Sequence, residues 1–284
     1  MTIITLKKTG FVIYYDTVLK YPILVIEKFN NKLQDCGINR EKIGEPFKPD
    51  PNLAKDISFS KKDYLTYMKY GGSYGHNAPA GFHKDSLKNY KSTFLFSNIS
   101  PQEVVFNSGL WVLLESFCKK LINKYKHVIV LTGNIKGYTK SFDNIKINIP
   151  TYMFKIIFVF HKGNVYNVNF IMKNKPYYKK LNIGKHKTTI DHIRKLQLKM
   201  GFDINMVINK IVNGKKIYNL TKIEPVKIDI DNKLEKQMKA SSLYGKFIYA
   251  KDYSSLQKIY KKERDNMGHY HKIYYKLAKN KLSQ

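Results

Sequence analysis

Residues 71–115 read GGSYGHNAPAGFHKDSLKNYKSTFLFSNISPQEVVFNSGLWVLLE, and this stretch decides the fold class and the chemistry of the chain. His76 lies among glycines and outside any apolar pattern, so we expect it in a flexible loop rather than in the core. Residues 108–125 carry apolar side chains at helical spacing, and Asn107 is a reasonable N-cap for that helix. Glu115 follows eight residues later, so on a helix its side chain would be rotated only about 80° from that of Asn107.

Three blocks of this stretch carry a family resemblance. They are Ser73–His76 followed by Asn-Ala-Pro-Ala, then Phe96–Gln102 (FSNISPQ), then Asn107–Glu115 (NSGLWVLLE). They resemble the D-R-G-H, L-S-N-x-x-P-Q and N-x-x-x-W-x-x-L-E motifs of the DNA/RNA non-specific endonuclease family, the ββα-metal nucleases that include endonuclease G. Any one block arises easily by chance, but three in this order with loop-sized gaps are much more specific. Weaker similarity on both sides extends the resemblance over roughly residues 8–205.

The resemblance implies the ββα-metal nuclease fold, an α+β class with a central antiparallel sheet flanked by helices. The local pattern agrees with that class, because strands alternate with loops and long helices are few. Strands are predicted at 11–15, 23–26, 93–97, 128–132, 152–160 and 165–172, and helices at 108–125 and 188–200. The prolines between residues 30 and 70 predict mostly loop there, and a further loop is predicted from Pro101 to Asn107.

We expect two parts, an endonuclease domain at 1–205 and a basic C-terminal extension rich in Tyr and Lys at 206–284. The extension has 18 Lys+Arg and 7 Asp+Glu, a net charge of +11. Apolar residues at helical spacing predict one long amphipathic helix over 254–282. Two interpretations stay open: extra grip on nucleic acid or a homodimer surface, and an ordinary helical appendage with solvated lysines.

The composition narrows the choice of partner. The 284 residues include 51 Lys+Arg against 21 Asp+Glu, a net charge of +30, which suits a polyanion such as nucleic acid better than a small neutral substrate. With 43% hydrophobic residues the chain can bury a core. No apolar run is long enough to cross a bilayer, and the start of the chain lacks a secretory signal pattern, so an intracellular setting is expected, with an organelle or a virion as options. Cys36 and Cys118 are too few for a disulfide framework.

Phosphodiester hydrolysis needs a nucleophile, neutralisation of the phosphate charge and help for the leaving oxygen. A neutral His76 can take a proton from water, and the surrounding positive charge lowers its pKa. The resemblance implies that Asn107 is the direct ligand of one Mg²⁺ whose other positions are mostly water, with Mn²⁺ as a substitute. Glu115 is expected to orient the waters of the metal, and Asn98 to fix a loop or position phosphate. The structural alternatives are a hydrogen-bonded loop histidine, a plain N-cap and an exposed helix acid.

The sequence departs from the family motif at two positions, because Ser73 and Tyr74 stand where the motif has Asp and Arg. Tyrosine offers one neutral donor and cannot replace a guanidinium beside the phosphate. The candidate substrate contacts are therefore Tyr74, Lys48, Lys84 and Arg40. Trp111 is expected in the core, and His83 is expected to be incidental.

The leading hypothesis is a Mg²⁺-dependent, sugar-non-specific endonuclease that cuts DNA and RNA to leave 5′-phosphates. The alternative is a weakened or inactive nuclease fold that binds or packages nucleic acid, which the substitutions at Ser73 and Tyr74 favour. Retention of His76, Asn107 and Glu115 together argues for the enzyme.

Overall fold

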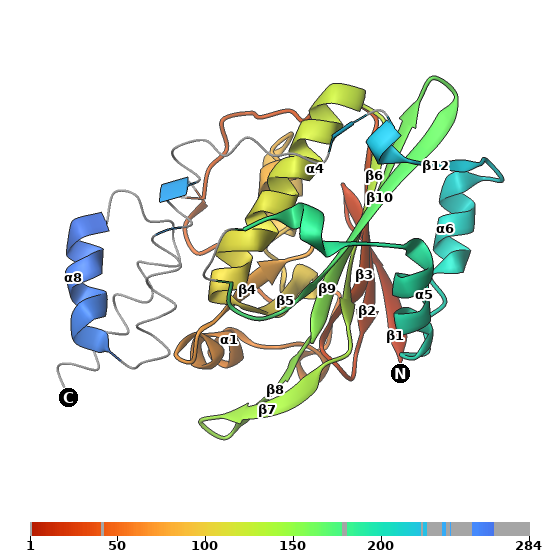
Figure 1. Cartoon of the computed structure of the whole chain (residues 1–284). Helices are drawn as coiled ribbons and strands as arrows, with labels where there is room; N and C mark the ends of the chain where they lie inside the picture. Colours follow the sequence, from red (N-terminus) through yellow and green to blue (C-terminus); the bar gives the residue numbers. More distant parts are fainter. Residues whose placement is uncertain are drawn as a thin grey trace.

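The computed structural model describes residues 2–40, 43–177, 181–222, 224–225, 235–236, 239 and 252–263 (Figure 1). Its main sheet has eight strands in the order β1-β2-β3-β6-β9-β10-β11, with β12 also pairing with β10. Their bounds are Ile3–Lys7, Phe11–Asp16, Tyr21–Phe29, Val128–Ile135, Tyr152–His161, Asn164–Lys173 and Lys187–Thr188, with β12 at Ile217–Asn219. The predicted α+β class with a large antiparallel sheet is confirmed.

The centre of the sheet follows the apolar runs of the sequence. Strands β9 and β10 pair antiparallel over their full length through a turn in which Lys162 and Gly163 both have positive φ. Such a two-residue turn matches the twist of the strands it joins. The predicted strand pairs 11–15 with 23–26 and 152–160 with 165–172 are therefore correct, whereas β1 and β12 had no strong pattern of their own.

Helices cover both faces of the sheet (Figure 1). Helix α4 (Val112–Tyr125) packs with Val128, Val130 and Ile157 on one face. Helices α5 (Ile190–Leu198) and α6 (Asn205–Val212) pack with Ile129 and Leu131 on the other. Alternate residues of one strand thus face different helical layers, as period-two geometry requires.

A two-stranded hairpin on the α4 side corrects three local predictions. Strand β4 (Gly72–His76) replaces the expected glycine loop, and it pairs with β5 (Ile99–Glu103), which occupies the start of the expected Pro101–Asn107 loop. The expected strand at 93–97 is a turn. Glycine suits this strand because a Cβ on Gly75 would lie 2.3 Å from Gln102 Oε1. Proline is tolerated in β5 because the sheet has only two strands and both are edges.

The helix after β5 begins earlier than the sequence suggested. Its first turn, α3 (Val104–Phe106), is capped by Glu103, whose carboxylate accepts from the backbone N–H groups of Val105 and Phe106. A π-helical turn (Asn107–Trp111) then leads into α4. Asn107 is therefore inside the helix and is not its N-cap, because the helix already begins at Val104 with Glu103 as its cap.

Part of the region predicted as loop is ordered. Helix α1 (Lys61–Met68) begins with a capping box in which Ser60 and Asp63 bond each other's backbone N–H groups. Helix α2 (Leu87–Ser92) follows the hairpin strand β4, and β7 (Tyr138–Phe142) pairs with β8 (Ile145–Ile149). The Ser-x-x-Asp spacing at residue 60 was the signal that could have revealed α1.

The chain beyond residue 205 is partly described. Strand β12 pairs parallel with β10, so the main sheet continues past the expected domain boundary at 205. Helix α8 (Tyr253–Glu263) buries Leu256 in the cluster that also holds Phe47 and Phe94. The rest of the predicted 254–282 helix lies outside the described residues, and so do most of the tyrosines of the extension. Among the described helices none is long and apolar enough to span a membrane.

Gly133→Ala should destabilise the fold, because the new Cβ would lie 2.2 Å from the Phe154 ring and 2.6 Å from the Ile23 carbonyl oxygen in the centre of the sheet. We expect a loss of about 1–3 kcal/mol in the free energy of unfolding, measured by urea titration. Gly81→Ala is the matched control, since a Cβ added there would meet nothing within 4 Å, and it should change stability by less than about 0.5 kcal/mol. Equal losses for both variants would contradict this account.

Candidate active site

His76 is the last residue of β4, opposite Ile99 of β5. Its half-buried ring lies between two buried aromatic rings, 5.6 Å from the centroid of Phe47 and 5.1 Å from that of Phe94. Its Nε2 atom is covered and makes no hydrogen bond within the described part of the chain. Burial and the Arg40 guanidinium lower the pKa of His76 to about 3. The imidazole is therefore neutral at physiological pH, the state that a general base needs.

A network of buried amides holds this hairpin against the main sheet. Asn77 donates to the carbonyl of Asn98 (2.9 Å) and to the hydroxyl of Ser100 (2.8 Å). Asn134 of β6 donates to the side chains of Asn77 (2.9 Å) and Ser100 (3.0 Å). Buried hydrogen bonds of this kind favour one arrangement, because breaking any of them is costly.

Asn98 holds the loop after His76. Its side-chain oxygen accepts from the backbone of Ala78, and its amide group donates to the carbonyls of Ala78 and Thr93, all at 2.8–2.9 Å. The residue is fully buried. Of the two roles expected of Asn98, fixing the loop accounts for these hydrogen bonds. None of these bonds leaves the Asn98 side chain facing solvent.

Asn107 is held to the hairpin by its own amide nitrogen. Nδ2 donates to the Ser73 hydroxyl (3.1 Å) and to the Tyr74 carbonyl (3.2 Å), and the Ser73 hydroxyl donates in turn to the Gln102 carbonyl (3.0 Å). With the amide group fixed in this way, Oδ1 is oriented away from these acceptors. A half-exposed, neutral oxygen suits a hard cation that keeps most of its water.

No cluster of three or more His, Cys, Asp or Glu side chains that could hold a metal occurs among the described residues. A neutral amide oxygen such as that of Asn107 is a ligand that suits Mg²⁺, which takes few protein oxygens and keeps several of its waters. The π-helical turn also affects where Glu115 lies relative to Asn107. Each residue of a π-helix rotates the chain by a smaller angle than in an α-helix, and this brings Glu115 closer to the helix face that carries Asn107.

Glu115 is half-buried beside the indole of Trp111, and its environment is dominated by packing. Burial raises the pKa of its carboxyl to about 7, the nearby Lys155 opposes the rise, and Glu27 adds to it. Glu115 is therefore poised between its two charge states near neutral pH, unlike an ordinary exposed helix acid. Trp111 is fully buried, as expected.

Three charged or titratable side chains that sequence reasoning had not assigned lie beneath this site. His83 donates or accepts through Nε2 at 2.8 Å from the Glu27 carboxylate, and both are buried, so the expectation that His83 is incidental is wrong. Lys155 is fully buried, with Nζ 2.6 Å from Thr132 Oγ1 and 5.0 Å from the centre of the Trp111 ring. Glu27 and Lys155 each interrupt an apolar strand, and that interruption was the available signal.

The four expected substrate contacts fall into different environments. Arg40 lies over the same rings as His76, with Cζ 5.6 Å from the centroid of Phe47 and 5.0 Å from that of Phe94. Lys48 is exposed next to Phe47, on a segment whose backbone bonds that of residues 94–96. Lys84 pairs with Asp35 at 2.7 Å.

Tyr74 is buried. Its ring stacks on Phe47 at 3.9 Å, and its hydroxyl oxygen is inaccessible to solvent. Of the four residues, Arg40 is therefore the one brought beside His76, and Tyr74 does not present its hydroxyl at the surface. Neither Phe47 nor Phe94 was a candidate from sequence, because an aromatic platform has no characteristic spacing.

Comparisons with known proteins agree with this fold. The structure is similar to a solved structure of the EndoG/EndoGI complex, with a TM-score of 0.59 and 22% identity over 68% of this chain and 82% of that chain, which shows the shared fold. Two curated relatives are the mitochondrial nucleases EXOG of Xenopus laevis, 29% identical over 64% of this chain and 53% of its own, and of Homo sapiens, 32% identical over 52% and 42%. The chain thus spans about half the length of these relatives.

The family model described as "DNA/RNA non-specific endonuclease" matches residues 2–208, the part that contains every strand of the main sheet except β12, the hairpin and the helix bearing Asn107. The family resemblance drawn from the three blocks is therefore confirmed: the chain belongs to the DNA/RNA non-specific endonuclease family.

Proposed function

We propose that the chain is a divalent-metal-dependent endonuclease that hydrolyses phosphodiester bonds of DNA and RNA and leaves 5′-phosphates. One observation carries the proposal: a neutral His76, the Arg40 guanidinium and the oriented oxygen of Asn107 belong to a single hairpin and its neighbours. Family membership and the nuclease names of the relatives support hydrolysis of nucleic acid in general. The mitochondrial location in those names supports an intracellular setting.

The residues divide the work as follows. An imidazole nitrogen of His76 takes the proton of an attacking water, a role worth about 10²–10⁴-fold in rate. Arg40 stabilises charge that develops on the phosphate, in place of the arginine lost at Tyr74. Asn107 would hold Mg²⁺ or Mn²⁺, with Glu115 orienting its waters. The ion, when bound, offsets the negative charge on the phosphate and on the leaving oxygen.

The alternative is a nucleic-acid-binding factor that retains the fold with little activity. The burial of Tyr74 favours it, because no cation occupies the motif position itself. Both proposals have DNA and RNA backbones as partners. A homodimer formed by the extension is a further proposal that concerns mostly residues outside the described part.

His76→Ala should lower plasmid cleavage in Mg²⁺ by about 10²–10⁴-fold, and Asn107→Ala should raise the Mg²⁺ concentration needed for half-maximal activity. Both are measured with purified full chain on supercoiled plasmid and on an RNA of similar length. The matched controls are His192→Ala and Asn209→Ala, two exposed residues on the opposite face of the sheet that should cut normally. Equal cutting by His76→Ala and the parent would refute the enzyme, and retained salt-dependent binding would then favour the alternative.

Arg40→Ala should lower kcat by about 10²–10³-fold, because it removes the guanidinium beside the general base. Arg40→Lys should recover part of the loss, since it restores the charge without the planar fork. Lys84→Ala should change kcat by less than about threefold, since Asp35 already pairs with that ammonium. If Lys84→Ala lowered kcat more than Arg40→Ala did, Lys84 and not Arg40 would be the phosphate contact.

The pH dependence should come from Glu115, whose pKa is raised to about 7, and not from His76, whose pKa is about 3. If ionised Glu115 is required, kcat/KM rises about tenfold per pH unit below 7 and levels off above it. The Glu115→Gln variant should be slower and nearly flat between pH 5.5 and 8. Because the pKa is raised, protonated Glu115 stabilises the fold at low pH, and that contribution is lost as the pH rises through 7. If kcat/KM of the Glu115→Gln variant still fell at low pH, another group would be responsible for that fall.

A further inference from the structure

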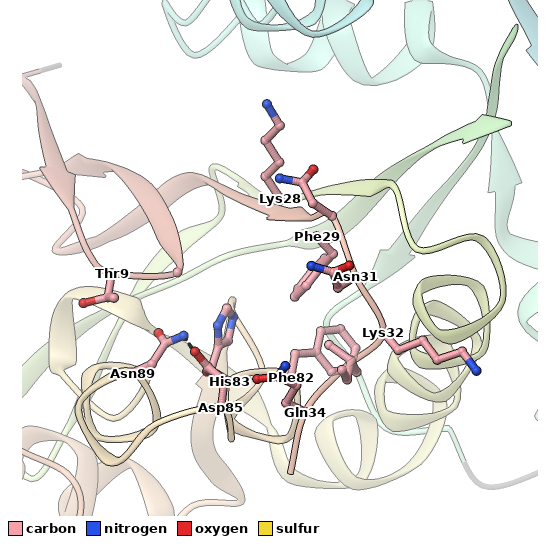
Figure 2. Close-up of a pocket in the computed structure, with 13 residues that line it drawn as sticks. Thr9, Lys28, Phe29, Asn31, Lys32, Gln34, Phe82, His83, Asp85 and Asn89 are labelled. Atoms are coloured by element: carbon pink, nitrogen blue, oxygen red, sulfur yellow. Dashed lines mark hydrogen bonds between the residues drawn. The ribbon is translucent and has the colours of Figure 1, made fainter. Parts of the chain in front are cut away.

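A cavity of about 260 Å³ opens beside the active site but shares no residue with it. It lies between the β1–β2 turn at Thr9 and Gly10, the end of β3 with residues 30–34, and the segment from Phe82 to Asn89 (Figure 2). His76, Asn107 and Glu115 do not line it. It therefore needs an account separate from the hydrolytic chemistry.

One wall of the cavity is aromatic. The rings of Phe29 and Phe82 lie edge to face at 5.9 Å, and the His83 ring lies 5.8 Å from Phe29. Phe29 is half-buried, so part of its ring faces the cavity. Nucleic-acid-binding proteins use such rings to stack unpaired bases, whatever the base.

The floor carries a polar atom that lacks a partner. Asn89 is 5% exposed, and its Nδ2 donates to Asp85 at 2.8 Å, which sets the orientation of the amide. Its Oδ1 is buried and has no hydrogen bond among the described residues. A buried acceptor without a donor is costly, and every nucleobase carries an N–H group that can supply one.

The floor is also tightly built. A Cβ on Gly10 would lie 2.6 Å from His83 Nδ1 and 2.8 Å from the Asn89 amide atoms, so only glycine lets the turn approach these side chains. The buried Glu27 carboxylate anchors His83 from below. Asn89 and the imidazole are therefore held in place before a ligand arrives.

The rim is basic. Lys28 and Lys32 are exposed, and their side chains extend outward from the lining residues in Figure 2. Neither pairs with a carboxylate in the described part of the chain. Two lysines above an aromatic and amide-lined cavity match a nucleotide, with the base inside and the phosphates at the rim.

The cavity is close enough to the hydrolytic residues to hold part of the same strand. Gln34 lines the cavity and Arg40 lies beside His76, so at most about 20 Å of extended chain separates their Cα atoms. That span equals about six nucleotides along one strand of a duplex. A single bound strand can reach both places.

We propose that this cavity binds one unpaired nucleotide of a nucleic acid strand that also occupies the active site. The base stacks on Phe29, one of its N–H groups donates to Asn89 Oδ1, and the flanking phosphates contact Lys28 and Lys32. The assignment rests on the proposed function for its substrate class. It makes single-stranded or frayed regions the preferred partners of this face.

The test compares a short oligothymidine strand with an abasic strand of the same length. Binding is measured by fluorescence anisotropy with the full chain carrying His76→Ala, so that nothing is cut. The parent should bind the oligothymidine about tenfold more tightly, because only that strand has a base to stack. Phe29→Ala and Asn89→Leu should reduce this ratio to about one. Lys28→Ala with Lys32→Ala should weaken both strands, and Lys210→Ala on α6 should weaken neither.

A parent ratio near one, or a ratio unchanged in Phe29→Ala and Asn89→Leu, overturns the cavity assignment. Thermal melts of the variants identify any that fail to fold, and the exposed lysine pair reports on the rim independently of the core. Cleavage by the protein that retains His76 is measured separately. Cutting with no base-dependent binding defeats the cavity alone, whereas base-dependent binding without cutting defeats only the hydrolytic proposal.

Discussion

The hydrogen bonds between buried amides at Asn77, Asn98 and Asn134 are the constraint on which the site depends. The β4–β5 hairpin does not pair with the main sheet, so no backbone ladder fixes its position. The amides replace that ladder with buried side-chain hydrogen bonds, which are costly to break. His76, at the end of β4, and Asn107, bonded to Ser73 and Tyr74, both take their positions from the hairpin.

A second constraint is electrostatic and lies under the helix that carries Glu115. Glu27 and His83 neutralise each other's cost of burial, while Lys155 lies between the Thr132 hydroxyl and the Trp111 ring. Burial, with a smaller contribution from Glu27, raises the pKa of Glu115 against the opposing effect of Lys155, while burial and the Arg40 guanidinium lower that of His76. Burial is thus the main cause of both shifts, and it favours the neutral form of each side chain.

The sequence predicted the parts of the fold that depend on local residue patterns or on the family motifs. The strand pairs 11–15 with 23–26 and 152–160 with 165–172 are rich in apolar residues, and the three blocks identified the family. The hairpin strand at 72–76 was missed because glycine has low strand propensity and gains its place only by close packing against Gln102. Asn107 was assigned to the wrong helix position, since the helix already begins at Val104 with Glu103 as its cap.

The site was predicted as a set of residues but not as an arrangement. Arg40 was one of four candidates, and only the aromatic rings of Phe47 and Phe94 distinguish it from Lys48 and Lys84. That platform joins residues 40, 47, 76 and 94, and no spacing rule links positions that meet through tertiary folding. The buried Glu27 and Lys155 left a visible interruption in their strands, but nothing in one sequence tells which partner each would find.

The π-helical turn from Asn107 to Trp111 makes chain length within the helix a determinant of the site. Asn107, the first residue of the turn, is tied to the hairpin, and the residues after the turn are tied to the sheet through α4. Deleting or inserting one residue within the turn would rotate one of these ends by about 100° relative to the other. The number of residues between Asn107 and Glu115 is therefore constrained. We expect natural variants to replace residues in this segment far more readily than to insert or delete them.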